Sequence, residues 1–442
     1  MRMNSIKRVD NEDVYDITVD DNHNFVANNI VVHNCAEIGL YPKSSKGVSG
    51  FQVCNLSEIN GSKCTTAELF FEACEAAAII GTIQAGYTDL DYLGTATKEI
   101  VEREALIGVS ITGWMNNPDV LFDSATLKKG AKIVKDTNKR IASMIGINQA
   151  ARCTTTKPAG NVSVLLETAS GIHPEHSKRY LRNVQINKEL EVGQLIKDTN
   201  PYMVEESVWS ENKTDYVISF PVIAPGTSIF KSDMMGVDLL EKVKLAQKYW
   251  IAAGTNEDLC VKKGMTHNIS NTITVGENWD EVRDYVFNNR YNFAAVSFLS
   301  ATGDKDYNQA PFTEVHTSAE LVRIYGDGAL LASGLIVDAH DGFDNLWEAC
   351  DSAVDGIVSD SQEVNDLRAN WIRRFKKFSE NHFNSDEKRT SYCLKDVYLL
   401  YKWTKIQSEY VKVNFVEDLK EKVYTEINTM AAAACHGGTC DL

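Results

Sequence analysis

The sequence predicts a mixed α/β protein that begins with a short β segment and ends in a mainly helical region. After residue 35, short apolar or β-branched runs alternate with stretches in which apolar residues recur at helical spacing. Strands that alternate with helices favour parallel pairing through crossover helices. From about Ser318 onward the helical pattern dominates, up to a tail of small residues at the end of the chain.

The predicted elements follow one another along the chain. Two β-branched runs, 13–19 and 29–32, flank a polar turn, and these 34 residues cannot bury a core unaided, so they are expected to pair with another polypeptide. Strands are predicted after them over residues 107–112, 154–156, 217–220, 269–275 and 294–299. Helices are predicted over residues 66–85, 127–144 and 239–253.

Charge and composition exclude several classes of function. A net charge of −16 over 442 residues argues against binding of a nucleic-acid polymer, because that affinity comes from clustered Lys and Arg. A single nucleotide held in a pocket remains compatible with this charge. The first thirty residues lack an apolar signal core, and no run of about eighteen apolar residues occurs. The sequence therefore predicts a cytoplasmic protein, in a host cell if a phage encodes it, with no membrane partner.

Four of the ten cysteines lie in motifs that carry chemistry. A cytoplasmic setting argues against a framework of structural disulfides. Six cysteines stand among apolar neighbours and are interpreted as buried thiols: Cys64, Cys74, Cys153, Cys260, Cys350 and Cys393. The remaining four, which do not fit that interpretation, are Cys35, Cys54, Cys435 and Cys440.

The triplet His33-Asn34-Cys35 places three complementary reactive groups in a row. The side-chain amide of Asn34 can attack its own carbonyl carbon, which closes an imide and cuts the chain before Cys35. His33 and His23 are suited to the acid–base catalysis that this slow attack requires. Cys35 can collect an upstream polypeptide as a thioester, and the Asp16 carboxylate can tune its protonation.

Residues 13–35 resemble the last two sequence blocks of inteins, which have a Hint-type fold, on these five residues. The triplet alone is weak, because it can occur by chance in a loop, and the placement of Asp16 and His23 ahead of it carries the resemblance. The chain starts 33 residues before Asn34 and lacks the block for the first splicing nucleophile. The resemblance therefore implies the C-terminal piece of a split intein, with an N-terminal split-intein/reductase chain as its partner.

Two short motifs carry a second resemblance, to the active-site loops of ribonucleotide reductases. They are Cys35 with Glu37 two residues later, and Cys54 at the start of a Cys-Asn-Leu run, and the likeness extends over residues 35–442. It implies that Cys35 forms a thiyl radical that abstracts the 3′-hydrogen of the ribose, and that Glu37 is the base for the 3′-hydroxyl. It also implies that Cys54 is one of two reducing thiols, with its partner in the family's N-terminal half.

The likeness is strongest to the adenosylcobalamin-dependent (class II) group, particularly its monomeric type acting on triphosphates. The tandem tyrosine of class I and the glycyl-radical motif of class III do not occur in the sequence. The resemblance implies adenosylcobalamin as cofactor, a ribonucleotide substrate, and half of a ten-stranded α/β barrel, with about five parallel strands. Two alternatives remain: a class I large-subunit fragment that needs a separate radical subunit, and a splicing-competent but catalytically inert barrel fragment.

The two resemblances meet at residue 34 and divide the chain. The predicted ranges are 1–34 for the intein segment, 35–317 for the half-barrel with its finger loop, 318–430 for the helical region and 431–442 for a flexible redox tail. The family has Asn two residues before the radical cysteine, normally followed by Pro, whereas this chain has His33 and Asn34 there. The reductase asparagine is therefore expected on the N-terminal polypeptide.

A run of small residues after the predicted strand 154–156 is a candidate phosphate site. It consists of Ala159, Gly160, Asn161, Val162 and Ser163, where backbone N–H groups can approach an anion at a helix N-terminus. An ordinary strand-to-helix turn is the simpler interpretation of these residues alone. The run also resembles the family's substrate-phosphate loop, as does the stretch 170–174.

Cys435 and Cys440 lie close to the end of the chain, separated by four residues. Half of a zinc site or an idle pair of thiols are the simpler interpretations, but zinc requires four ligands and only His436 is near. A dithiol on a mobile end suits a shuttle that reduces a disulfide by exchange and is then recharged. The family's tail has this role, which implies a thioredoxin-like reductant as partner.

Overall fold

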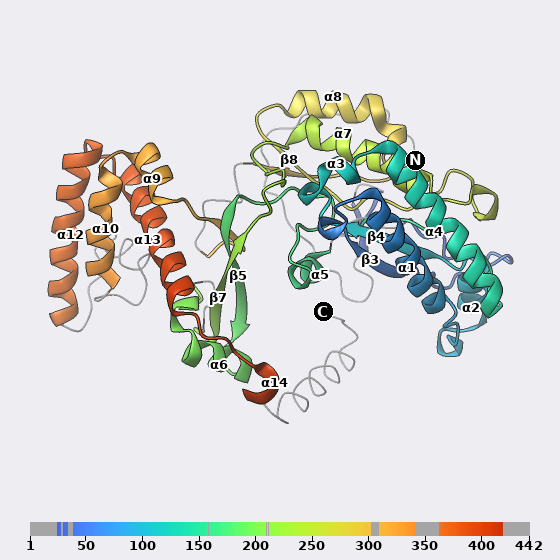
Figure 1. The fold of residues 1–442 in the computed structure, drawn as a ribbon, viewed down its shortest axis with the longest axis horizontal. Coiled ribbons are helices and arrows are strands. Elements are labelled where there is room, and N and C mark those ends of the chain that lie inside the picture. Colours follow the sequence, from blue (N-terminus) through green and yellow to red (C-terminus); the bar gives the residue numbers. More distant parts are fainter. Residues whose placement is uncertain are drawn as a thin grey trace. The chain divides into compact units, whose positions relative to one another are not determined.

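The computed structural model describes residues 24–27, 30–33, 39–157, 159–208, 210, 212–301, 309–340 and 362–418. These residues form a mixed α/β fold, as predicted (Figure 1). The chain divides into two compact units, the first made of Met1–Ser177 and Ala224–Thr302 and the second of Lys178–Ile223 and Gly303–Leu442. Among the described residues, no helix is both long and apolar enough to cross a membrane.

Parallel strands organise the first unit. The parallel partners are β3 (Asn55–Asn60) with β4 (Ile107–Thr112), and β8 (Thr272–Val275) with β9 (Ser297–Ser300). The extended segment 154–156 connects the two pairs, because Thr154 bridges Val109 of β4 and Thr156 bridges Ile269 ahead of β8, both in parallel. Extended segments from five stretches of the chain thus run in parallel through this unit.

Three helices pack against these strands and enclose the core of the first unit: α1 (Ala67–Ala85), α4 (Ser124–Ile145) and α7 (Gly236–Ala246), which continues as the π-helix Gln247–Ala252. α1 lies beside α4 (Figure 1). Phe70 of α1 contacts Trp250 with ring centroids 5.7 Å apart, and both side chains are buried. Every residue of β4 is buried, which is typical of a strand covered on both faces. Shorter helices complete the unit: α2 (Thr95–Glu104), α3 (Pro118–Leu121), α5 (Gly160–Leu165) and α8 (Trp279–Asn289).

β1 (Asn24–Ala27) and β2 (Ile30–His33) form an antiparallel pair near the start of the chain. Asn24 lies opposite His33 in this pairing. The strand predicted over residues 29–32 is therefore confirmed as β2, whereas the strand predicted over 13–19 lies outside the described residues.

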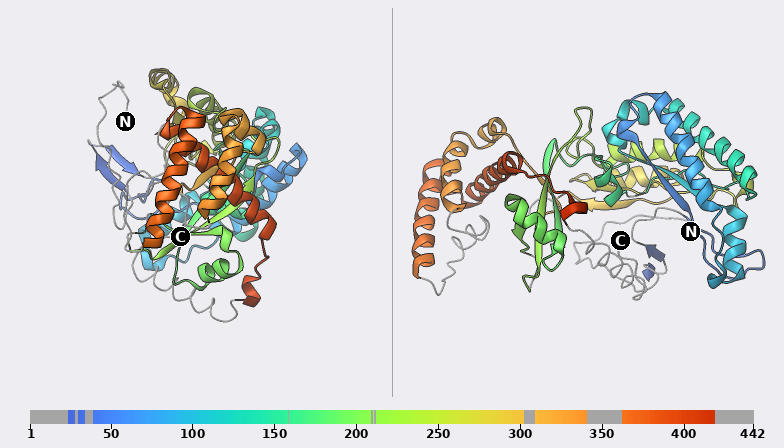
Figure 2. Two further views of the ribbon diagram at one scale, coloured as in Figure 1. Left: turned by 90° about the vertical axis from the view of Figure 1, so that its left-hand side faces the viewer. Right: turned by 60° about the horizontal axis from the view of Figure 1, so that its bottom comes forward.

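The second unit contains an antiparallel sheet with strand order β10-β5-β7-β6. The strands are β5 (Arg179–Asn187), β6 (Val204–Glu206), β7 (Asp215–Ile223) and β10 (Phe312–Glu314), and α6 (Glu191–Thr199) lies between β5 and β6 in the sequence. Figure 2 shows β5 and β7 as the long green strands side by side.

The helical prediction from Ser318 onward is confirmed in the described part of this region. Its helices are α9 (Ser318–Tyr325), α10 (Gly328–His340), α12 (Gln362–Phe383), α13 (Glu387–Glu409) and α14 (Phe415–Asp418). Thr317 starts α9 with a capping box, in which its hydroxyl accepts from the Glu320 N–H and the Glu320 carboxylate accepts from the Thr317 N–H. Trp371 of α12 and Leu394 of α13 are buried in the core that these helices share.

Two expectations about the strands and the ranges differ from the structure. The predicted strand 217–220 exists, but it belongs to the antiparallel β7, so it is not one of the parallel strands. β3, which was not predicted as a strand, takes the fifth parallel position. Residues 178–223 group with the chain after residue 303, whereas the prediction included them in the range 35–317.

Candidate functional site

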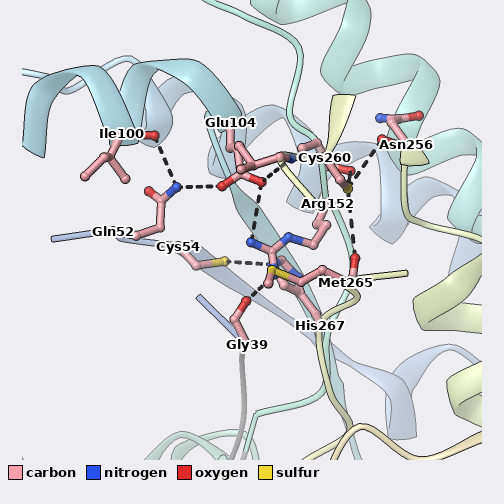
Figure 3. Close-up of polar contacts among 12 residues, drawn as sticks. Gly39, Gln52, Cys54, Ile100, Glu104, Arg152, Asn256, Cys260, Met265 and His267 are labelled. Carbon is pink, nitrogen blue, oxygen red and sulfur yellow. Dashed lines mark hydrogen bonds and ion pairs between the residues drawn. The ribbon is translucent and has the colours of Figure 1, made fainter. Parts of the chain in front are cut away.

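Cys54 immediately precedes β3, at the amino end of the parallel strands (Figure 3). Its side chain is half-buried, and Asn55 behind it donates a hydrogen bond from Nδ2 to the carbonyl oxygen of Leu106, at 3.1 Å. A Cβ on Gly108 of β4 would lie 3.0 Å from the Cys54 sulfur and 2.5 Å from Leu56. Glycine at position 108 therefore leaves room for the side chains of Cys54 and Leu56 beside β4.

A buried ion pair lies next to Cys54, as Figure 3 shows. Glu104 ends α2 and Arg152 precedes the extended segment 154–156, and both side chains are fully buried with Nη2 of Arg152 3.8 Å from Oε1 of Glu104. The amide of Gln52 donates to Oε2 of Glu104 at 3.1 Å. Because removal of a charge from water is expensive, each member of such a pair needs the other. Through Gln52, the network holds the chain just before Cys54.

Arg152 also reaches the segment that leads away from Cys35. Its Nη1 donates a hydrogen bond to the carbonyl oxygen of Gly39, four residues after Cys35 in the sequence. Burial lowers the pKa of Arg152, while the Glu104 carboxylate and the nearby thiols of Cys260 and Cys54 act in the opposite direction. Arg152 thus connects Glu104, next to Cys54, with the described segment that begins at Gly39.

His267 lies close to the thiol of Cys54 and to Arg152. Its Nε2 lies 3.9 Å from the Cys54 sulfur, and its Nδ1 lies 3.1 Å from the carbonyl oxygen of Thr154. The side chain is fully buried. Burial and the positive charge of Arg152 lower the pKa of His267 to about 3, so the imidazole is neutral near pH 7.

The cysteines interpreted as buried thiols are found in two environments. Burial is confirmed for Cys64, Cys74, Cys153 and Cys393, and Cys350 lies outside the described residues. Cys260 is instead half-buried near Arg152, and its thiol is within hydrogen-bonding distance of the carbonyl oxygens of Ala151 (3.7 Å), Asn256 (3.5 Å) and Met265 (3.9 Å). Burial raises the pKa of Cys260, and Arg152 opposes that rise.

The predicted phosphate loop forms the start of α5. Ala159 is the N-cap residue and Gly160 begins the helix, with open space where a Cβ of Gly160 would stand. Ser163 donates its hydroxyl to the carbonyl oxygen of Gly160 at 2.8 Å, and Val162 is partly exposed, whereas the side chain of Asn161 lies outside the description. The first N–H groups of a helix have no partner within the helix. The N–H groups of Ala159 and Ser163 donate within the fold, to the carbonyl oxygens of Lys157 and Ala159. The backbone donors at the start of this helix are therefore the N–H groups of residues 160–162.

Two polar residues next to this loop are used within the fold. Lys157 forms an ion pair with Glu58, Nζ to Oε2, at 2.9 Å. His173, in the stretch 170–174, has Nδ1 3.0 Å from the carbonyl oxygen of Ser170 and accepts a hydrogen bond from the Thr272 N–H at Nε2, at 2.9 Å. His173 is therefore interpreted as a buried histidine that holds the loop to β8.

The structure separates the predicted site residues that it describes. Cys54 lies at the amino end of β3. The loop at 159–163 follows the carboxyl end of segment 154–156, which runs parallel to β3 and lies next to β4. His33 is the last residue of β2. The remaining predicted site residues lie outside the described chain: Asp16, His23, Asn34, Cys35, Glu37, Cys435 and Cys440.

Sequence reasoning missed the polar residues around Cys54. Glu104, Arg152 and His267 come from three distant stretches of the chain and lie in no recognisable motif. A charged residue that ends an amphipathic helix, such as Glu104, is normally exposed, so its burial is set only by long-range packing. The run of three threonines after Arg152 was the single local signal of a buried strand nearby.

Comparisons with known proteins agree on one family. A probable adenosylcobalamin-dependent ribonucleoside-triphosphate reductase of Dictyostelium discoideum is 25% identical over 344 residues, which cover 74% of this chain and 41% of that protein. The adenosylcobalamin-dependent ribonucleoside-triphosphate reductase of Euglena gracilis is 22% identical over 327 residues, 71% of this chain and 41% of the relative. No family model matches the chain.

A solved structure supports the fold. The crystal structure of a B12-dependent (class II) ribonucleotide reductase matches 65% of this chain and 40% of its own chain, with a TM-score of 0.51 and 17% sequence identity. The chain thus spans about two-fifths of the length of the curated relatives it matches. The chain is therefore similar in sequence to adenosylcobalamin-dependent ribonucleoside-triphosphate reductases, and it has the fold of part of a class II ribonucleotide reductase.

Proposed function

We propose that this chain is the C-terminal part of an adenosylcobalamin-dependent ribonucleoside-triphosphate reductase, and that protein trans-splicing joins it to the N-terminal part. The position of Cys54 carries the reductase proposal. This thiol is half-buried at the amino end of β3, against Gly108 and beside His267, in the unit that contains the parallel strands. A cysteine held in one place by glycine and histidine is suited to a defined redox step better than an exposed surface thiol is.

The reaction sets the roles of the thiols. Replacing the 2′-hydroxyl of a ribonucleotide by hydrogen releases water and consumes two electrons and two protons. Two thiols supply these as they become a disulfide, and Cys54 is proposed as one of them, with its partner on the N-terminal polypeptide. Cys35 would carry the thiyl radical that takes the 3′-hydrogen, and Glu37 would accept the proton of the 3′-hydroxyl.

Adenosylcobalamin is proposed from the names of the two relatives. When bound, this cofactor supplies the radical chemistry that begins the reaction. Among the described residues, no three or more His, Cys, Asp or Glu side chains gather where they could hold a metal ion. The proposal assigns the named residues of the chain to substrate and thiol chemistry.

The remaining predicted residues complete the proposal. Ala159, Gly160, Asn161, Val162 and Ser163 would form the loop that binds the triphosphate, through the backbone N–H groups of residues 160–162 at the start of α5. Cys435 and Cys440 would reduce the disulfide of Cys54 by exchange and would then be reduced by a thioredoxin-like protein.

The proposal of splicing rests on the junction between residues 33 and 35. The antiparallel pair β1–β2, which ends at His33, supports it, because a β hairpin leading into the His-Asn-Cys triplet fits the last block of an intein. Asn34 would cyclise, His33 and His23 would assist, and Cys35 would receive the upstream polypeptide, with Asp16 tuning its protonation.

Co-expression with the matching N-terminal chain tests both proposals separately. The intact mass of the product is expected to show loss of residues 1–34 and a new polypeptide joined to Cys35, and Asn34→Ala is expected to abolish cleavage at the junction. The spliced product is expected to reduce ribonucleoside triphosphates only with adenosylcobalamin, and Cys54→Ser is expected to abolish this activity. An unchanged mass contradicts trans-splicing, and a spliced product that reduces no ribonucleoside triphosphate with adenosylcobalamin contradicts the reductase assignment. Full activity of the Cys54→Ser product contradicts the role proposed for Cys54.

A further inference from the structure

His267 is placed to act on the thiol of Cys54 through a single nitrogen atom. Nε2 lies 3.9 Å from the sulfur, within the longer reach of hydrogen bonds that involve sulfur. The other ring nitrogen, Nδ1, faces the carbonyl oxygen of Thr154 at 3.1 Å. A carbonyl oxygen only accepts hydrogen bonds, so Nδ1 must carry the ring proton of a neutral imidazole. Nε2 is then a bare acceptor that points at Cys54, and the thiol must donate (Figure 3).

A positive charge next to the same thiol acts in the opposite sense. Arg152 is fully buried, and its Nε and Nη2 have no hydrogen-bond partner among the residues that the structure describes. The carboxylate of Glu104 is 3.8 Å from Nη2, so the charge is only loosely paired. A cation close to a cysteine favours the thiolate. Two opposing influences thus act on the thiol of Cys54. The Arg152 cation favours the thiolate, whereas Nε2 of His267 accepts a hydrogen bond only from the protonated thiol.

We propose that His267 is a positioning residue that keeps Cys54 as a neutral thiol, with its S–H directed along the hydrogen bond to Nε2. Cys54 must carry its hydrogen to reduce a substrate, and a thiolate beside Arg152 would instead be open to oxidation and alkylation. The charged and titratable side chains around the thiol include Arg152, Glu104, Cys260 and His267 itself. The importance of the Cys54–His267 bond for catalysis rests on the proposed function. The bond itself is argued from the geometry alone.

Two substitutions of His267 separate its two hydrogen bonds. In His267→Asn the side-chain amide can take the place of Nδ1 and donate to Thr154, but this shorter side chain does not reach the Cys54 sulfur. In His267→Gln the longer side chain can place an acceptor oxygen near the former Nε2. His267→Asn is therefore the test variant, and His267→Gln is the matched control that rescues the acceptor.

The measurement is the rate of iodoacetamide alkylation of Cys54 in the native full-length chain, followed by peptide mass spectrometry over a range of pH. Since one net hydrogen bond is lost from the protonated form, His267→Asn is expected to raise the rate near pH 7 by roughly two- to tenfold and to move the midpoint of the profile to lower pH. His267→Gln is expected to behave as the wild type does. A Cys54 profile in His267→Asn that is unchanged or slower, or a His267→Gln profile equal to that of His267→Asn, overturns the proposal.

The other cysteines report whether the fold is intact. Cys74 and Cys153 are buried and must stay unreactive, and the rate at half-buried Cys260 must stay unchanged. If a variant unfolds, Cys54→Ala in a ¹⁵N-histidine-labelled chain tests the same bond without a change at His267. Loss of the thiol is expected to move the Nε2 resonance downfield, and an unmoved resonance overturns the proposal. None of these measurements uses reductase activity, so failure of the proposed Cys54–His267 bond can be distinguished from failure of the reductase assignment.

Discussion

At the scale of single residues, the site combines a motif that the sequence shows with partners that it does not. Cys54 could be predicted from its Cys-Asn-Leu run, because the motif is local. Arg152, Glu104 and His267 could not, because each is buried by contacts between stretches that are far apart in the chain. A buried ion pair and a buried neutral histidine both carry a desolvation penalty. Because burial of these polar side chains around one thiol costs stability, we infer that they have a role beyond stabilising the fold.

The buried neutral His267 makes the stability of the first unit depend on pH. Its folded pKa of about 3 lies below the ordinary value near 6.5, so on acidification the unfolded chain binds a proton that the folded chain does not. Stability is therefore expected to be higher at pH 7 than at pH 5, by about 2 kcal/mol from this group alone. Urea unfolding followed by the fluorescence of buried Trp114 and Trp250 measures the effect. In His267→Gln this part of the pH dependence should vanish, and an equally steep dependence would assign it to other groups, such as buried His173.

Gly108 is predicted to be sensitive to substitution for reasons of space. The Cβ of Gly108→Ala would stand 2.5 Å from the Cδ2 methyl of Leu56 and 3.0 Å from both the Cys54 sulfur and the Thr155 side chain, so these side chains must shift. Such overpacking is expected to lower the free energy of unfolding by about 1–3 kcal/mol and to change the alkylation rate of Cys54. Gly276→Ala is the matched control, because nothing lies within 4 Å of its added Cβ. Equal stabilities for the two variants would contradict the strand spacing described here.

At the scale of elements, the sequence predicted the positions of most strands better than it predicted their partners and directions. Residues 107–112 and 269–275 overlap the parallel strands β4 and β8, because continuous apolar runs mark strands that are buried on both faces. Residues 294–299 overlap β9, although most of its side chains are exposed. β3 escaped prediction because its run, Asn-Leu-Ser-Glu-Ile-Asn, is mostly polar and only Ile59 is buried. β7 has the same local pattern as the parallel strands, but its partners β5 and β6 make it antiparallel. Strand direction depends on such distant pairing, which local pattern does not encode.

Helix α13 is predicted to depend on one buried lysine for its contact with the sheet of the second unit. Nζ of Lys402 lies 2.8 Å from Oε1 of Glu205 and donates to the Ser219 hydroxyl at 2.8 Å. Burial raises the pKa of Glu205, but Lys402 and a hydrogen bond from the Tyr398 hydroxyl outweigh it, so this pKa lies below its ordinary value. Lys402→Met leaves the carboxylate without its cation and is expected to destabilise the unit by about 3 kcal/mol in urea unfolding.

Lys405→Met, on the same helix, is the matched control for this prediction. Lys405 pairs with Glu409 at 2.9 Å, but both side chains are partly exposed, and such pairs contribute little. The control is therefore expected to unfold almost as the wild type does. A Lys402→Met variant that is equally stable would show that the Glu205 pair is not what holds α13 to the sheet.

At the scale of the whole molecule, the chain crosses between its two units three times. Residues 178–223 leave the first unit, form β5 to β7 and return, so the unit boundaries do not follow the ranges that motif order predicted. Motif order reports where chemistry lies along the chain, whereas compactness depends on which segments pack together. The class of fold and the helical C-terminal region could be predicted because both arise from local periodicity.

The role proposed for the tail cysteines Cys435 and Cys440 can be tested in the spliced product. Cys435 and Cys440 are expected to pass electrons from a thioredoxin-like protein to the disulfide that Cys54 forms, so they act after each turnover and not during it. In the spliced product, the double variant Cys435→Ser/Cys440→Ser is therefore expected to complete one turnover at the wild-type rate and then stop when thioredoxin is the reductant. A small dithiol that can enter the site should restore multiple turnovers, because it replaces the tail and not the site. Cys54→Ser should fail with either reductant. If the tail variant turns over normally with thioredoxin, the two cysteines are the idle pair of thiols that their sequence also allows, and the disulfide must be reduced directly.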